Sequence, residues 1–326
     1  MKVVALAKYA SFQCMAGNCP STCCAGWSIL VDRKDYMRFQ ELEPEWLRED
    51  ILSNIKHKDS KYYFQNTKDG KCAMLDQDGL CRIQRNTSEE MLCNTCRKYP
   101  RLIRSMGEIL YLSMAASCPV VAEYLVMQPI EWNVIDDCGT MKNVTVGDLA
   151  MTKNAWSLFQ EHWAMALEFC KVHSSVSILY QCFEKMAAGI LEILSQNPEG
   201  CISAESFLAF EKDTSGNVAA FLNNERVLWE NIVDHYMNYR VFSRKIEYPE
   251  EKDLDCIRQA QGELFLLRTL AFSRFCENNT LLASDWQDLL QRVYRFSAHG
   301  EKVSALFQKM VREFFTQDVF WSFLLI

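Results

Sequence analysis

Nine cysteines between positions 14 and 118 are the residues of this sequence whose spacing most clearly suggests chemistry. Cys14, Cys19, Cys23 and Cys24 form a first group, Cys72 and Cys81 a second, and Cys93-x-x-Cys96 a third, while Cys118 follows in "SMAASCP". Thiolates this close together repel one another and oxidise unless a cation neutralises them. A metal bound by several loops also contributes its binding free energy to folding. We therefore expect these nine cysteines to include metal ligands.

The identity of the metal stays open between zinc and an iron–sulfur cluster. His57 is the only histidine in residues 1–140, which argues against a Cys2His2 zinc site. All-sulfur ligation suits tetrahedral zinc and a [4Fe-4S] cluster equally well. Nine thiols exceed one four-ligand centre, so either there are two centres or some of the nine are catalytic or simply buried. The remaining six stand alone and are expected to be structural: Cys138, Cys170, Cys182, Cys201, Cys256 and Cys276.

Composition places the chain among ordinary globular proteins. It has 326 residues, of which 49% are hydrophobic and 24% charged, with a net charge of −7. The negative charge argues against nucleic acid as a partner. No apolar run is long enough to cross a membrane, and the first residues lack a signal-peptide core. We expect a cytoplasmic protein with no membrane partner, where cysteines stay reduced and disulfides are the weaker interpretation.

The elements that must position the cysteines are irregular, whereas the rest of the chain is patterned for helices. Residues 1–140 hold ten of the fifteen cysteines and five of the seven prolines. They predict a loop-rich metal-binding region with short helices and a small hairpin between Cys72 and Cys81. Residues 141–326 predict an all-α domain, so the fold class is mainly α. Helices are expected over 158–194 with a break near Ser174, and over 217–246, 253–276 and 284–298, the last with Ser284 as its N-cap. The apolar end "FFTQDVFWSFLLI" is expected to pack into the core or onto another subunit.

Four stretches together resemble the flagellin lysine-N-methylase family of bacteria. They are "CMAGNCPSTCCAGWSILVD", "CAMLDQDGLCRIQ", "LCNTCRKYPR" and "SCPVVAEYL", and "ENIVDHYMNYRVF" matches an aromatic helix of that family in outline. The cysteine core is also similar to small zinc- or iron-chelating cysteine proteins. The resemblance implies methyl transfer from S-adenosylmethionine to lysines of flagellin, with an iron–sulfur cluster associated.

If the resemblance holds, the cofactor site is of an unfamiliar type, because the chain has no G-x-G turn of the dinucleotide-binding kind. Arg97 and Arg101 lie in the most basic stretch and are candidates for binding a cofactor carboxylate. The same stretch could instead bind an acidic partner, or be a solvated face that balances an anionic thiolate cluster.

Methyl transfer also requires a neutral lysine amine, and hence a base or a desolvated slot. The helix at 230–240 offers His235 and Tyr236 as catalytic candidates. The alternative interpretation is an ordinary amphipathic helix.

Three functions therefore compete. The first is a protein-lysine N-methyltransferase acting on flagellin. The second is a non-catalytic or electron-transferring metalloprotein with zinc or an iron–sulfur cluster and a helical partner-binding module. The third is a structural zinc protein that docks a partner through its helices.

Overall fold

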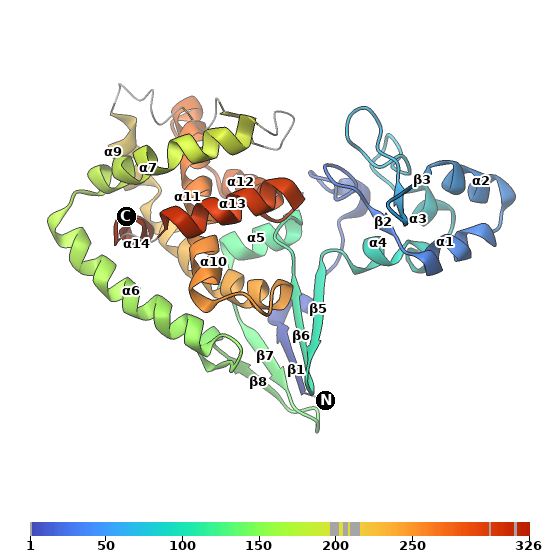
Figure 1. The fold of residues 1–326 in the computed structure, drawn as a ribbon, viewed down its shortest axis with the longest axis horizontal. Coiled ribbons are helices and arrows are strands. Elements are labelled where there is room, and N and C mark those ends of the chain that lie inside the picture. The colour runs from blue at the N-terminus through green and yellow to red at the C-terminus, as the bar shows by residue number, and fades with distance from the viewer. Residues whose placement is uncertain (1, 196–201, 205–207, 209–215, 300, 316–317) are drawn as a thin grey trace. The chain divides into compact units, whose positions relative to one another are not determined.

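The computed structural model describes residues 2–195, 202–204, 208, 216–299, 301–315 and 318–326. The chain divides into two compact units. The helical unit comprises Met1–Ser11 and Leu102–Ile326, and the cysteine unit comprises Phe12–Arg101. The fold is mainly α, as the sequence predicts, with additional β-sheet toward the N-terminal end of the chain (Figure 1).

The helical unit contains a five-stranded sheet, in the order β5-β6-β1-β7-β8, that the sequence does not predict. Its strands are β1 (Lys2–Leu6), β5 (Arg101–Met106), β6 (Ile109–Met114), β7 (Trp132–Ile135) and β8 (Met141–Val144). Strand β1 pairs in parallel with β6 and antiparallel with β7. The division that patterning places near residue 140 therefore differs from the compact units, since residues 102–140 pair with the first strand of the chain.

The helices predicted over 158–194, 217–246, 253–276 and 284–298 are present among the described helices of this unit. The described helices are α5 (Pro119–Met127), α6 (Lys153–Val172), α7 (Ser175–Ser195), α9 (Asn217–Asn224), α10 (Arg226–Glu247), α11 (Asp253–Asn278), α12 (Ala283–Ala298), α13 (Glu301–Phe314) and α14 (Asp318–Ser322). Of these, α5, α13 and α14 lie outside the predicted ranges. The break predicted near Ser174 is confirmed between α6 and α7. Among the described residues, none of the helices has both the length and the apolar character that crossing a membrane requires.

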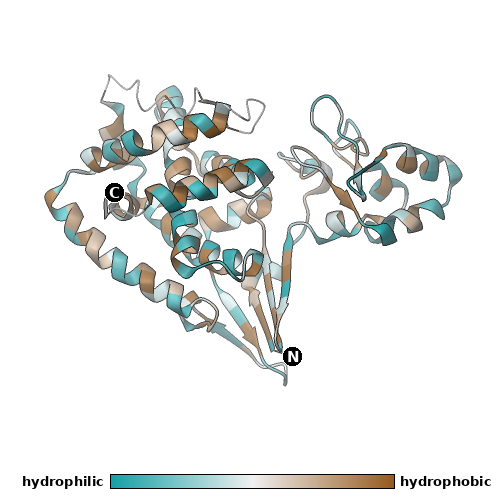
Figure 2. Ribbon diagram, viewed as in Figure 1, coloured by the Kyte–Doolittle hydropathy of each residue, from teal (hydrophilic) through white to brown (hydrophobic). Residues whose placement is uncertain are grey.

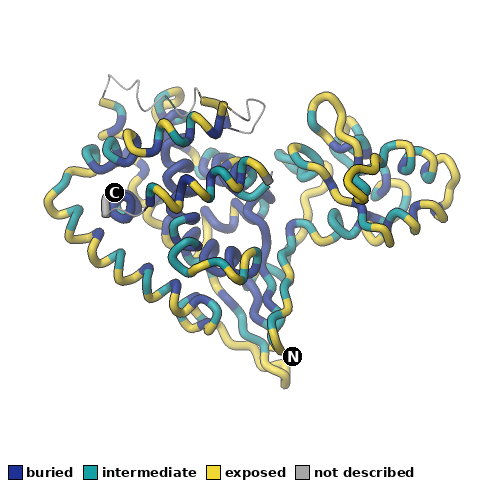
Figure 3. Tube along the Cα trace, in the orientation of Figure 1, coloured by how far each residue is buried: buried dark blue, intermediate teal, exposed yellow. Residues whose placement is uncertain are grey.

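Helices α10 and α11 form the centre of this unit. Every residue of α11 from Gln259 to Ser273 is buried, and most residues of α10 from Ile232 to Ile246 are buried as well. Buried stretches are dark blue in Figure 3, and the helices of this unit carry both hydrophobic and hydrophilic residues (Figure 2). A helix buried on all sides lies in the interior of a domain. The apolar chain end packs into the core as predicted, with Phe320, Trp321 and Phe323 buried.

The N-cap predicted for α12 is wrong. The helix begins at Ala283, so Ser284 lies inside its first turn. The carboxylate of Asp285 instead accepts the backbone N–H of Leu282 at 2.8 Å. An aspartate in the first turn thus satisfies one of the free amides at the helix start.

The cysteine unit is built from short helices and strands and has a small core of its own. Its elements are β2 (Leu30–Val31), α1 (Arg33–Gln40), α2 (Glu45–Ser53), β3 (Ile55–Lys58), β4 (Lys61–Phe64), α3 (Arg82–Asn86), a 3-10 turn η3 (Glu89–Met91) and α4 (Asn94–Lys98). The strands form a sheet in the order β2-β4-β3. In place of the predicted hairpin, Leu75 and Cys81 form an isolated antiparallel bridge around the turn at Gly79.

Candidate functional site

Backbone pairing in the cysteine unit brings cysteines that are distant in sequence together. Ala25 bridges to Lys71, and the N–H of Cys72 donates to the carbonyl of Cys24 at 2.6 Å. The first and second cysteine groups are therefore held side by side. The N–H of Arg82 donates to the carbonyl of Met74, which places Cys81 against the same core.

Five thiols gather around this core, and we call them the thiol cluster. Cys72 and Cys93 are buried members of the core, and Cys24, Cys81 and Cys96 pack against it. All five are reduced. The Sγ atoms of Cys93 and Cys96 lie 3.5 Å apart.

The pKa values of these thiols show that they repel one another when charged. The pKa of Cys72 is raised to about 12, chiefly by burial, with negative charge on Cys24, Cys81 and Cys93 contributing and a hydrogen bond with the backbone of Met74 opposing the shift. Burial also raises the pKa of Cys81, with Cys24 and Cys93 adding to the shift. Removing the protons of the cluster together requires compensating positive charge.

Two thiols of the cluster are shifted toward the thiolate by a neighbouring thiol. A hydrogen bond from Cys23 lowers the pKa of Cys24 to about 7, against the effect of burial. The hydrogen bond with Cys96 lowers the pKa of Cys93 and raises that of Cys96 well above its usual value. Thiolate, and not thiol, is the form that ligates metals.

The thiol cluster offers the sulfur donors that a thiophilic metal prefers, but its sulfur atoms are not arranged around a common point. Sulfur-only donors suit zinc or iron–sulfur centres. Within the part of the chain that the structure describes, no group of three or more His, Cys, Asp or Glu side chains is arranged to hold a metal ion. Convergence of these sulfurs onto one cation would require their side chains to move.

The other predicted ligands lie outside the thiol cluster. Cys14 is exposed, and its sulfur accepts the N–H of Ala16. Cys19 donates to the carbonyl of Ser21, and the carbonyl of Cys23 accepts the indole N–H of Trp27 at 2.6 Å. Cys118 is buried in the helical unit, where it precedes α5. Of the cysteines expected to be structural, Cys201 lies outside the described residues.

Arg97 lines a surface pocket of about 360 Å³ in the cysteine unit, together with Lys34, Asp35, Met37 and Arg38 of α1 and with Glu41, which follows this helix. Its guanidinium donates to the carbonyl of Glu90 at 3.3 Å and lies 3.9 Å from the carboxylate of Asp35. The guanidinium of Arg101 instead lies over the ring of Phe12. Of the two predicted carboxylate-binding arginines, only Arg97 is among the residues that line this pocket.

Much of the positive charge in this region is neutralised internally. Arg82 makes two hydrogen bonds to the carboxylate of Asp50, at 2.7 and 3.0 Å. Arg85 pairs with Asp76 and Asp78. These two arginines therefore stabilise the unit, and ion pairs of this kind could not be read from the basic run alone.

The predicted catalytic pair lies inside the helical unit. The Nδ1 atom of His235 is 3.0 Å from the carbonyl of Leu125, and the side chain is almost fully buried. The hydroxyl of Tyr236 donates to Glu263 at 2.8 Å, and burial raises its pKa well above the usual value. Both side chains contact the core in this structure, and their catalytic role stays a prediction.

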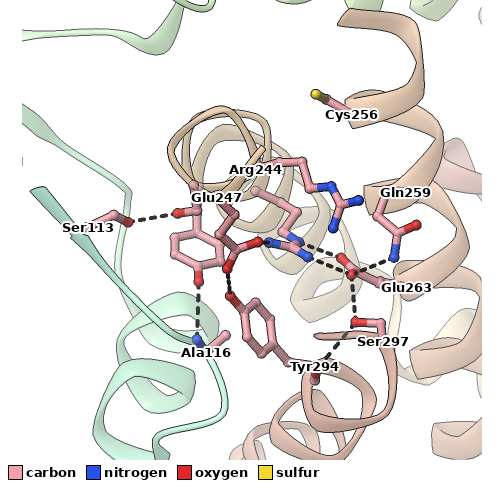
Figure 4. Close-up of polar contacts among 12 residues, drawn as sticks. Ser113, Ala116, Arg244, Glu247, Cys256, Gln259, Glu263, Tyr294 and Ser297 are labelled. Carbon is pink, nitrogen blue, oxygen red and sulfur yellow. Dashed lines mark hydrogen bonds and ion pairs between the residues drawn. The ribbon is translucent and has the colours of Figure 1, made fainter. Parts of the chain in front are cut away.

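Glu263 is the centre of a polar network that sequence reasoning missed (Figure 4). Arg240 makes two hydrogen bonds to it, and Gln259 and Ser297 donate to the same carboxylate. Arg240 also donates to Glu247, which accepts from Tyr294. These polar residues of α10, α11 and α12 thus join three helices in the core.

Comparison with known proteins finds relatives of this chain that include lysine-N-methylases and a flagellar biosynthetic protein. A stretch of 123 residues, 36% of this chain, is 27% identical to the flagellar biosynthetic protein FliU of Salmonella muenchen and covers 73% of that protein. The chain is also 27% identical, over the same number of residues, to the lysine-N-methylases of Salmonella typhimurium and Salmonella choleraesuis, of which the match covers 31%. No protein-family model matches the chain, and no solved structure matches it. The resemblance to lysine-N-methylases that the cysteine motifs indicate is thereby confirmed over about a third of the chain.

Proposed function

We propose that this protein is a protein-lysine N-methyltransferase that acts on flagellin, takes its methyl group from S-adenosylmethionine and carries a cysteine-ligated metal centre. The observation that supports this most strongly is the similarity to two lysine-N-methylases and to a flagellar biosynthetic protein. The chain spans about a third of the length of those lysine-N-methylases, so the activity and the substrate are part of the proposal.

The thiol cluster supplies the proposed ligands. Cys24, Cys72, Cys81, Cys93 and Cys96 share one core, and their mutual repulsion is relieved by a bound cation. A [4Fe-4S] cluster would supply one-electron redox chemistry at this place, and zinc would supply cross-linking of the loops alone. Cys14, Cys19, Cys23 and Cys118 are proposed as ligands only if a second centre forms.

Arg97 supplies the proposed contact with the cofactor. Its side chain is 38% exposed and lines the pocket beside α1, so it can reach a carboxylate in solution. A guanidinium binds a carboxylate through two parallel hydrogen bonds. We assign the amino-acid carboxylate of S-adenosylmethionine to this arginine.

The transfer itself is a displacement at carbon. The lysine Nζ would form a bond to the methyl carbon as the bond from the sulfonium to the methyl group breaks, and the sulfur would leave as a neutral thioether. The lysine, whose free pKa is about 10.4, would first give its proton to solvent water so that Nζ has a lone pair for the attack. His235 and Tyr236 contact the core and carry no step in this proposal.

Incubating the metal-loaded protein with flagellin and labelled S-adenosylmethionine tests the proposal. We expect methyllysine by mass spectrometry, and an Arg97→Gln variant with a raised KM for the cofactor and little change in kcat. Lys98→Gln, which changes the exposed neighbouring residue, is the control. Absence of transfer from fully loaded protein, with and without reductant, would contradict the methyltransferase.

An electron-transfer metalloprotein is the second candidate. It is favoured by one observation, that the thiol cluster lies in a compact unit with its own hydrophobic core. This function predicts reversible reduction of the metal centre in protein that transfers no methyl group. Redox titration of the same sample separates the two candidates.

A further inference from the structure

The Cys93-x-x-Cys96 segment is preceded by backbone groups that need partners. The 3-10 turn η3 ends at Met91, and the carbonyls at and just after the end of such a turn find no backbone N–H donor inside it. Arg38, on α1, donates to three of them: Glu90 at 3.0 Å, Met91 at 3.2 Å and Leu92 at 2.9 Å. One guanidinium therefore binds the chain immediately before Cys93.

Asp35 holds the other side of the same segment. Its side chain is 4% exposed, and its Oδ2 atom accepts the backbone N–H of Asn94 at 2.5 Å. Its Oδ1 atom accepts from Arg38 at 2.8 Å. A carboxylate this buried requires hydrogen bonds and positive charge, and here Asn94 and Arg38 provide both.

A second element fixes the segment from β2. The carbonyl of Leu30 accepts the hydroxyl of Thr95 at 2.6 Å and the thiol of Cys93 at 3.7 Å. The backbone on both sides of Cys93 is thus bound to α1, and Thr95 is bound to β2. Local sequence cannot produce this arrangement, because Asp35 and Asn94 are 59 positions apart.

We infer that Asp35 and Arg38 are positioning residues that hold the Cys93-x-x-Cys96 thiols in place for metal binding. The inference rests on the proposed metal centre, and it adds a role for two residues that carry no sulfur. Partners that orient metal ligands typically affect metal affinity by roughly 10- to 100-fold when they are removed. Arg38 is suited to the role because its planar fork reaches several acceptors at once, which a lysine ammonium cannot do in the same geometry.

The test compares Asp35→Asn and Arg38→Lys with Arg48→Lys. Arg48, on α2, is a matched control because its side chain is 24% exposed, against 29% for Arg38, and it bonds to Leu42, Glu43 and Glu45. The first measurement is hydrogen exchange of the peptide 88–98 in reduced protein, with the peptide 45–53 reporting whether the unit stays folded. The second is the rate at which a chelator removes the metal.

We expect faster exchange in 88–98 and roughly 10- to 100-fold faster metal capture in both test variants, with Arg48→Lys like the wild type. Unchanged exchange in 88–98 would overturn the inference. Faster exchange with unchanged capture would overturn it too, because the contacts would then hold the backbone without positioning the ligands. If the wild type binds no metal, the metal proposal fails on its own, and the exchange measurement still shows whether Asp35 and Arg38 hold the thiol segment.

Discussion

The thiols of this protein show how strongly environment separates residues of one type. A hydrogen bond from Cys23 lowers the pKa of Cys24 to about 7, whereas burial raises the pKa of Cys72 to about 12. The crowding of cysteines is visible in the sequence, but which five share a core is not. That grouping depends on the pairing of residues 24–26 with 70–72, which spacing along the chain does not encode.

His299 gives a test of burial at the same scale. Its Nε2 atom lies 2.8 Å from the hydroxyl of Ser117. Its pKa is lowered from 6.5 to about 4, chiefly by burial, with the positive charges of Arg295 and Arg240 contributing and Glu247 opposing the shift. Below pH 6.5 the unfolded chain takes up a proton that the folded protein excludes until about pH 4. The free energy of unfolding should therefore fall as the pH is lowered through this window.

The expected loss from this imidazole is about 2 kcal/mol at about pH 5. Denaturant unfolding at neutral pH and at about pH 5, compared between wild type and His299→Gln, measures it. The variant should lose less stability on acidification by about that amount. An identical loss in both proteins would show that His299 is not excluded from protonation.

At the level of elements, helix positions follow from periodicity but their neighbours do not. The predicted helices over 158–194 and 253–276 are present as α6, α7 and α11. One interpretation of the 230–240 segment is an ordinary amphipathic helix. In the structure Arg240 of α10 is buried, because it pairs with Glu263 of α11, and a pairing between two helices cannot be read from one helix alone.

The Arg240–Glu263 pair predicts a large mutational cost. Both side chains are 0% exposed, so Glu263→Gln leaves a buried guanidinium short of one counter-charge. We expect a loss of about 3–5 kcal/mol in the free energy of unfolding. Glu230→Gln breaks the exposed pair with Arg226 and should change stability by at most about 1 kcal/mol. Equal effects in urea unfolding would contradict the role of burial.

Helices α11 and α13 lie close together at Gly262. A Cβ atom there would overlap Val311 and lie 3.3 Å from the ring of Phe307. Gly262→Ala should therefore destabilise the protein by about 1–3 kcal/mol, although alanine favours helices by about 1 kcal/mol.

Gly189→Ala is the comparison for that substitution. The added methyl group would meet the side chain of Met310, which is flexible and can move aside. We expect Gly189→Ala to lower the temperature of unfolding less than Gly262→Ala does, or to raise it. A gain for Gly262→Ala would show that the two helices can separate at low cost.

For the whole molecule, the β-sheet depends on pairing between strands that are distant in sequence, and the sequence alone does not predict that pairing. Strand β1 pairs with β6 and β7, whose residues lie more than a hundred positions away. A five-residue apolar strand at the start of the chain carries no sign of these partners. Hence the mainly helical class was predictable, while the five-stranded sheet and the extent of the two units were not.

The central claim is that the thiol cluster binds a metal cation. Metal and labile sulfide analysis of the anaerobically purified protein tests it most directly, with Cys72→Ser against the exposed-site control Cys138→Ser. We expect bound metal in the wild type and in Cys138→Ser and its loss in Cys72→Ser, with iron and sulfide identifying an iron–sulfur cluster and zinc alone identifying the simpler centre. Metal-free wild-type protein whose cluster thiols all react with an alkylating agent would contradict the claim.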